Sequence, residues 1–311
     1  MFNKLKNYFP LLCRVVLLSF VMLMAVSAQA KEQKCKIVAT TTLWAELVKQ
    51  IAGDKAEVQA IASPKFNVHF YPPKPSDVRK VAQSDLYVST GLDLEAWSDP
   101  LLEAAGKPQL FRGGPRFVDL SAGIKLLEAP TQLSRAEGDI HVFGNPHYAM
   151  NPENAKIMAK TILTKLIEID PENREYYETN TQSFLTKLDE KIREWKKLCS
   201  HCRGKEVISY HDDMVYLADF LGLKAEQSLE PKPGIPPTPK HLNFLENYIR
   251  EHNIKAIVSP TFYSPHAPEK LAKRTGIKTV TICQNAGEVK GTEDFFKFFD
   301  YNIQKISEAV Q

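Results

Sequence analysis

The sequence predicts an α/β protein of two lobes, each a parallel sheet flanked by helices, joined by one long rigid backbone helix. Short apolar runs alternate with amphipathic stretches over residues 36–105 and again over residues 206–309. This βαβα order is typical of parallel sheets covered by helices on both faces. Between the two regions lies a long polar stretch with no Gly or Pro after Pro171 and with apolar residues at helical spacing.

The first region divides into alternating strands and helices. Residues 36–41 contain the apolar run of a buried strand, and Gly53 is expected to end the helix that follows. Pro75 and Asp77 are typical of the first turn of a helix. The elements expected here are strands at 36–41, 57–62 and 86–89, helices at 43–51, 75–82 and 92–105, and a loop at 122–150.

The linking region and the second lobe show the same kinds of pattern. Helices are expected at 152–169 and 171–197, and the second, of about 26 residues, would be about 39 Å long, enough to bridge two lobes. The later elements expected are strands at 206–210, 223–229, 256–259 and 279–283, helices at 213–220, 239–252, 268–275 and 292–309, and a proline-rich loop at 230–239. The predicted division is an N-terminal lobe at 31–165, a linking helix region at 166–203 and a C-terminal lobe at 204–311.

Residues 1–30 have the pattern of a secretory signal peptide. Basic side chains come first, the uncharged apolar run 15–26 follows, and Ala28-Gln29-Ala30 supplies small residues for cleavage after Ala30. An uncleaved membrane anchor is the alternative. Cys35 lacks the small and apolar neighbours of a lipid-modified cysteine, so we expect no lipid anchor and a periplasmic protein that is not itself embedded in the membrane.

Charge and cysteine content narrow the remaining possibilities. Cleavage would leave 281 residues with 37 basic and 37 acidic side chains, a balance that favours neither nucleic acid nor a membrane surface as partner. A monomer is expected. Export permits disulfides, and Cys199 and Cys202 form a CxxC that we interpret as a local structural disulfide. Whether Cys35 and Cys283 pair is left open.

Three histidines fall close to predicted strand or helix ends. His69 follows a strand, His147 precedes a helix, and His211 lies between a strand and a helix. Ligands of open α/β sheets bind beyond the carboxyl ends of the strands, so two such edges facing each other could bring these imidazoles together. Three histidines suit Zn²⁺ better than Mg²⁺ or Ca²⁺, which prefer oxygen ligands.

Four segments give the chain a resemblance to a known family. Residues 69–77 read His-Phe-Tyr-Pro-Pro-Lys-Pro-Ser-Asp, a His and an aromatic followed by Pro-x-Pro-Ser-Asp. The others are residues 36–41 with 51–53, Asn-Pro-His-Tyr at 145–148 with Asn-Pro-Glu-Asn at 151–154, and Ser-Tyr-His-Asp at 209–212 with Phe-Leu-Gly-Leu at 220–223. In this order they resemble the zinc/manganese-specific solute-binding proteins of ABC importers, over essentially all of the chain after the signal.

The resemblance implies a function and a ligand set. His69, His147 and His211 would bind a metal between the lobes, and the protein would deliver it to the membrane permease of an ABC-type importer. Zinc is expected, with manganese or another divalent metal as the alternative, because a third histidine in place of a carboxylate favours the softer ion. The stretch 125–139 contains no histidine, so a histidine-rich metal-collecting loop is not expected.

Two positions depart from the family pattern. Val68 stands where the family usually has Pro, and Gln284 stands where it usually has an Asp ligand. The fourth position could therefore be Gln284, a water or a nearby carboxylate. The carboxylates considered are Glu230, Asp212 and Glu288. Cys283 and His141 are weaker alternatives, as a further ligand and an accessory ligand respectively.

A zinc metalloenzyme is the alternative from a different class. Three histidines with a bound water also form hydrolytic zinc sites. No motif in the sequence places a carboxylate as general base, and no GxSxG nucleophile motif is present. The sequence therefore predicts a receptor and not an enzyme.

Overall fold

The structure, a computed structural model, describes residues 34–129 and 141–311. Cys35–Gln311 form one compact unit. The predicted signal peptide and its cleavage site after Ala30 lie outside the described residues, as does the part of the predicted loop at 130–140.

The first half of the unit is built on a four-stranded parallel sheet. Its strands are β1 (Cys35–Ala39), β2 (Ala56–Ala60), β3 (Leu86–Ser89) and β4 (Phe117–Asp119), in the order β2-β1-β3-β4. Both central strands, β1 and β3, are largely buried, as expected for a sheet covered on both faces. The short strand β4 was not predicted.

Three helices accompany this sheet: α2 (Thr42–Ala52), α3 (Pro75–Ala82) and α4 (Ser98–Ala105). The hydroxyl of Thr41 caps α2 by accepting from the backbone N–H of Trp44. The prediction of a helix from residue 92 was wrong at its start. Leu92 and Asp93 have φ of 53° and 58°, a left-handed conformation that a right-handed helix cannot include, so α4 begins only at Ser98.

The second half repeats the arrangement. Its strands are β5 (Glu206–Ser209), β6 (Lys224–Ser228), β7 (Ala256–Pro260) and β8 (Lys278–Ile282), again all parallel, in the order β6-β5-β7-β8. Its helices are α7 (Val215–Leu221), α8 (Pro239–His252), α9 (His266–Thr275) and α10 (Phe295–Ala309). The predicted pair of parallel α/β lobes is confirmed, with element bounds that differ by a few residues.

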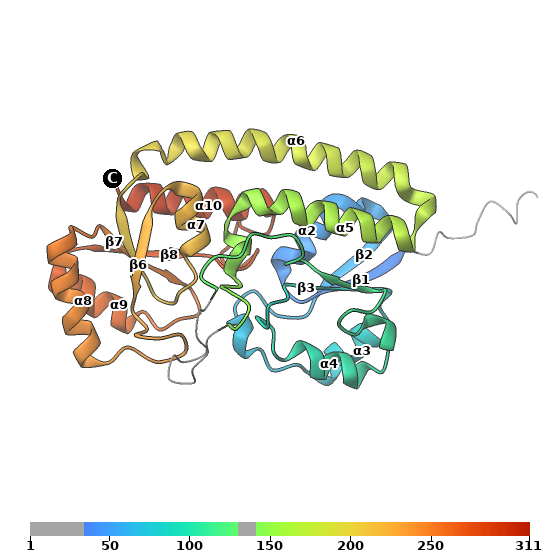
Figure 1. Ribbon diagram of the computed structural model, residues 1–311, viewed down its shortest axis with the longest axis horizontal. Coiled ribbons are helices and arrows are strands. Elements are labelled where there is room, and N and C mark those ends of the chain that lie inside the picture. The colour runs from blue at the N-terminus through green and yellow to red at the C-terminus, as the bar shows by residue number, and fades with distance from the viewer. Residues whose placement is uncertain (1–33, 130–140) are drawn as a thin grey trace, which may run out of the picture. The chain divides into compact units, whose positions relative to one another are not determined.

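A long helix, α6 (Arg174–Leu198), follows α5 (Ala155–Ile169) and runs along both lobes (Figure 1). Its 25 residues span about 37 Å. Near its start, the Tyr176 hydroxyl donates to Asp54 Oδ1 at 2.8 Å in the first lobe. Near its end, Trp195 Nε1 donates to Asp300 Oδ1 at 2.7 Å on α10 in the second lobe. The predicted bridging helix is therefore present.

The four described cysteines, Cys35, Cys199, Cys202 and Cys283, are all free thiols. The predicted Cys199–Cys202 disulfide is not formed in this structure, and Cys35 and Cys283 are not paired with each other. Cys199 instead directs its Sγ to the carbonyl oxygen of Ile303 on α10, at 3.7 Å. The hydrogen bond with Cys199 is the main cause that lowers the pKa of Cys202, to about 7.

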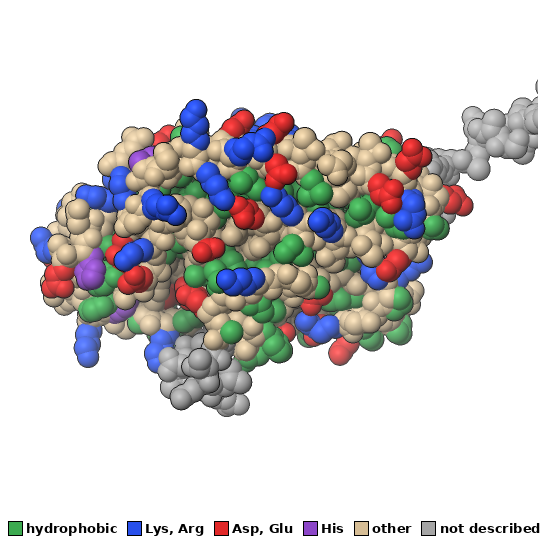
Figure 2. Space-filling view, turned by 45° about the horizontal axis from the view of Figure 1, so that its top comes forward, with side chains coloured by type: hydrophobic (Ala, Val, Ile, Leu, Met, Phe, Trp, Pro, Cys, Tyr) green, Lys and Arg blue, Asp and Glu red, His purple; other side chains and the backbone are tan. Residues whose placement is uncertain are grey.

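The surface agrees with the charge balance of the sequence. Figure 2 shows basic and acidic side chains interspersed over the visible face, with no large area of one sign.

Within residues 34–129 and 141–311, no helix combines the length and apolar character that crossing a membrane requires.

The contact between α6 and α10 gives a stability prediction. Phe184 is 3% exposed, and its ring lies 5.3 Å from that of Phe295 and 5.4 Å from that of Phe296. We expect Phe184→Ala to lower the free energy of unfolding by about 3–5 kcal/mol, since it leaves a cavity between helix and lobe. The matched control is Ser183→Ala on the exposed face of α6, expected to change it by less than about 0.5 kcal/mol. Urea unfolding followed by circular dichroism measures both, and equal effects would contradict the predicted role of this contact.

Candidate metal centre

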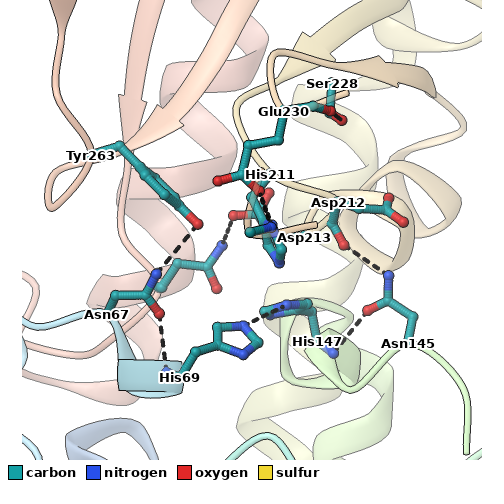
Figure 3. A network of polar contacts seen from close by, with 12 residues as sticks. Asn67, His69, Asn145, His147, His211, Asp212, Asp213, Ser228, Glu230 and Tyr263 are labelled. Carbon is teal, nitrogen blue, oxygen red and sulfur yellow. Dashed lines mark hydrogen bonds and ion pairs between the residues drawn. The ribbon is translucent and has the colours of Figure 1, made fainter. Parts of the chain in front are cut away.

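Three imidazoles from separate segments meet between the two lobes (Figure 3). The ring centroids of His69, His147 and His211 lie 5.3 Å apart in all three pairs. One ligand atom from each residue lies within 4.8 Å of the others, and no Cys or carboxylate joins this group among the described residues. His147 and His211 are buried and His69 is partly buried.

An asparagine side chain fixes the segment of His69, which lies in the short 3-10 helix η2 (Val68–Phe70). Oδ1 of Asn67 accepts from the backbone N–H of His69 at 3.0 Å, a turn in which an Asn side chain holds the residue two positions on. Nδ2 of the same amide donates to the hydroxyl of Tyr263 in the second lobe at 3.4 Å. Trp97 Nε1 also donates to the carbonyl oxygen of Val68 at 2.7 Å.

His147 is held in the same way. It begins the short 3-10 helix η5 (His147–Met150), and its backbone N–H donates to Oδ1 of Asn145 at 3.0 Å. Nδ2 of Asn145 donates to the carbonyl oxygen of Asp212 in the second lobe at 2.8 Å and to Glu128 Oε2 at 3.0 Å. Each of the two asparagines thus orders a histidine segment and binds the opposite lobe with the same amide group.

His211 comes from the carboxyl end of β5, in the second lobe. Its Nδ1 lies 2.7 Å from Oε2 of Glu230, a side chain that is 8% exposed. The backbone N–H of Gly234 donates to the same oxygen at 3.0 Å. Because a carboxylate only accepts, Nδ1 carries a proton, and in the neutral ring Nε2 has the lone pair that can bind a metal. A carboxylate behind a histidine in this way is the usual support of a metal-binding imidazole.

The imidazoles differ in their protonation. Burial lowers the pKa of His69 well below its usual value, and the charges of His211 and His141 lower it further. The pKa of His147 is also lowered well below its usual value, first by burial and then by the neighbouring histidines. Burial alone would lower the pKa of His211, but the hydrogen bond to Glu230 and the nearby carboxylates raise it above its usual value. Two of the three rings are therefore held in the neutral form that binds metals.

Gln284 follows β8 at the carboxyl edge of the second sheet. Its Nε2 donates to Oδ2 of Asp213 at 2.8 Å, which links it to the loop that carries His211. Asp213 is 2% exposed. Burial raises the pKa of its carboxyl to about 7, and the charge of Asp212 adds to the rise while that of His211 opposes it. The structure thus brings Gln284 next to the histidine loop through a residue that the sequence analysis did not single out.

The other fourth-position candidates have different partners. Both oxygens of Glu288 are used by the turn after β8 and by β7, since they accept from the backbone N–H groups of Thr261, Gln284 and Asn285. Asp212 lies beside Glu128, whose pKa is raised by burial and by the Asp212 charge. Cys283 is buried and directs its Sγ to the hydroxyl of Thr292 at 3.9 Å. Oε2 of Glu230 accepts a hydrogen bond from Nδ1 of His211.

His141 lies beside the group of three, with its ring centroid 5.1 Å from that of His69 and 6.3 Å from that of His147. The roles of Asn67 and Asp213 were not predicted from the sequence, and Glu230 was considered only as a fourth donor. One signal for the first was present, because Asn stands two residues before His at both 67–69 and 145–147. Nothing in the local sequence marks the other two, since each contacts a residue from another segment.

The spacing of the ring nitrogens suits a tetrahedral zinc ion. Zinc–nitrogen bonds of about 2.0–2.1 Å in a tetrahedron put neighbouring nitrogens about 3.3 Å apart. Nε2 of His69 and Nε2 of His147 lie 3.4 Å apart. The arrangement can therefore hold a divalent metal by three imidazoles, with one position left for a further donor.

The fold and the site together define the class of protein as a metal-binding receptor of a transport system. The defining features are two parallel α/β lobes, a long helix across both and a histidine group between them. The family described as "Zinc-uptake complex component A periplasmic" matches residues 37–309, and the chain belongs to it. The family is made of transport components, so the prediction that the chain is not an enzyme is confirmed.

Named relatives cover most of the chain. It is 28% identical over 272 residues to the high-affinity zinc uptake system protein ZnuA of Bacillus subtilis (strain 168), covering 86% of this chain and 84% of the relative. It is 27% identical over 309 residues to the manganese ABC transporter substrate-binding lipoprotein PsaA of Streptococcus anginosus, covering 95% and 97%. A crystal structure of ZnuA has the same fold, with a TM-score of 0.76 at 23% identity over 90% of this chain and 100% of that one.

The double use of Asn145 gives a prediction. We expect Asn145→Ala to lower the free energy of unfolding by about 1–3 kcal/mol, because the variant leaves the backbone N–H of His147 and the carbonyl of Asp212 without this partner. Asn243→Ala, on the exposed face of α8, is the matched control and should change it by less than about 0.5 kcal/mol. Denaturant unfolding of the metal-free protein is the measurement. A loss no greater than that of the control would show that the amide does not couple the lobes.

Proposed function

We propose that this chain is a periplasmic zinc receptor that binds Zn²⁺ through His69, His147, His211 and Gln284 and delivers it to the membrane permease of an ABC-type importer. The observation that carries the proposal is the equal 5.3 Å spacing of the three rings, with two ring nitrogens 3.4 Å apart. Membership of the zinc-uptake family and the names of the relatives support the transport role.

Zinc is favoured over manganese by the chemistry of the donors. Three imidazoles and a single amide oxygen form a nitrogen-rich, borderline-soft set, whereas manganese prefers carboxylate oxygens. The relatives include both a zinc uptake protein and a manganese transporter component. Manganese, or another divalent metal, is therefore the alternative cargo.

Gln284 is the proposed fourth donor because of its orientation. Its Nε2 donates to Asp213, so that Oε1 is the end of the amide available to a metal. An amide oxygen is a neutral donor with two lone pairs. Glu288 is a weaker candidate, since both of its oxygens already accept backbone N–H groups.

The remaining parts of the proposal concern the whole chain. Residues 1–30 are removed after Ala30 on export, residues 31–165 and 204–311 act as the two lobes, and residues 166–203 form the linking helix region. The protein acts as a monomer and meets its permease at the membrane. The long helix α6, packed on both lobes, supports small rather than large lobe movement.

Metal titration tests the proposal. The mature protein is stripped with a chelator, and zinc and manganese are titrated separately by calorimetry. We expect one tight zinc site per chain and weaker manganese binding. His69→Ala, His147→Ala and His211→Ala should each weaken zinc binding by at least about tenfold.

His266→Ala is the matched control, because His266 is exposed on α9. It should leave zinc affinity unchanged. Tight manganese binding with weak zinc binding would favour the alternative cargo. Wild-type affinity in all three site variants would exclude the proposed site.

A further inference from the structure

The proposed ligand set leaves a charge to be balanced, and this inference rests on the proposed function. Three neutral imidazoles and a neutral amide bring no negative charge to a doubly charged cation. An uncompensated charge is costly in a buried site. The compensating carboxylate must then lie behind the ligands, in contact with them rather than with the metal.

Asp213 has the surroundings of such a carboxylate. Its side chain is 2% exposed, and Oδ2 accepts from Nε2 of Gln284 at 2.8 Å. Over the described part of the chain, its Oδ1 is buried without a hydrogen-bond partner, and no Lys or Arg forms an ion pair with it. A buried carboxylate with an unused oxygen and no Lys or Arg partner is unfavourable by itself, and a cation bound nearby would offset that cost.

The local backbone keeps Asp213 beside the histidine site. The backbone N–H of Asp213 donates to the carbonyl oxygen of His211 at 2.8 Å, a tight turn that spans three residues. Figure 3 shows the Asp213 carboxylate close to the His211 ring. The same carboxylate thus contacts the Gln284 amide and lies next to a second proposed ligand.

We propose that Asp213 is the positioning residue that provides negative charge for the bound cation and turns the Gln284 amide so that its Oε1 faces the metal. An ionised carboxylate accepts hydrogen bonds but cannot donate them, so it selects the NH₂ end of the amide and excludes the flipped orientation. The negative charge therefore lies on Asp213, which contacts Gln284, and not on residue 284 itself.

Glu230 has the equivalent role at another ligand. Its Oε2 accepts from Nδ1 of His211, so its charge acts through the imidazole, as that of Asp213 acts through the amide. The two buried carboxylates together match the charge of a divalent cation. They also explain how a site with no direct carboxylate donor can hold such an ion.

The variant Asp213→Asn removes the negative charge of the side chain and leaves its size and shape nearly unchanged. The side-chain oxygen of the introduced amide can still accept from Gln284, so we expect the melting temperature of the metal-free protein to stay the same or rise. Zinc affinity, measured by competition with a chromophoric chelator at pH ~8, where ordinary histidines are neutral, should fall by about tenfold or more. Asp219→Asn, at an exposed position of α7, is the matched control and should bind zinc as the wild type does.

A double variant returns the charge to the other partner. Asp213→Asn with Gln284→Glu exchanges the amide and the carboxylate across the same hydrogen bond. We expect it to recover zinc affinity to within about threefold of the wild type, because one carboxylate again lies next to the cation. Recovery by the double variant would support the charge role of Asp213.

The possible failures can be told apart. If the wild type does not bind zinc or manganese, the proposed function itself fails. If the wild type binds zinc tightly and Asp213→Asn binds it equally, the receptor stands and the role of Asp213 is overturned. If Asp213→Asn lowers both the metal-free melting temperature and zinc affinity, and the double variant restores neither, Asp213 is a structural residue and the inference is likewise overturned.

Discussion

The arrangement of the whole unit depends on the burial of one helix face against two separate lobes. The apolar side of α6 contacts α2 and α5 in the first half and α10 in the second. Because one continuous helix serves both lobes, the distance between the two sheets is set by the packing along about 37 Å of helix. The segments that follow β2, β4 and β5 carry His69, His147 and His211 respectively. These three side chains meet between the lobes (Figure 3).

Within that frame, side chains rather than backbone hydrogen bonds connect the lobes at the site. Asn67 and Asn145 each order a histidine segment and reach the other lobe, while Tyr216 accepts from Leu127 and donates to the carbonyl oxygen of Asn145. Glu288 collects backbone N–H groups from the ends of β7 and β8 and so fixes the turn of Gln284. Each proposed ligand is thus held by a second residue whose own position is fixed by the fold.

The sequence predicts much of this structure because most of its elements are strongly periodic. The parallel lobes, the long helix and the grouping of His69, His147 and His211 all follow from local patterns, strand ends and the family resemblance. The start of α4 could not be predicted, because a leucine such as Leu92 seldom adopts the left-handed conformation that it has here. The link between Asp213 and Gln284 joins residues 71 positions apart, and the partner of Cys199 is a backbone carbonyl on α10. Contacts between segments that are distant in the sequence cannot be recognised from the local pattern of either segment.

The double role of the two asparagines has a thermodynamic consequence. Each amide holds a histidine with one end and the opposite lobe with the other, so separation of the lobes must loosen the imidazoles that it connects. Lobe separation and cargo affinity are then linked quantities, and linkage of this kind is reciprocal. A cation bound by these histidines would hold the lobes together, and any partner that pulls the lobes apart would lower the affinity for the cation by the same free energy. Release of the cation would then need no further conformational change, because separation of the lobes also moves the imidazoles apart.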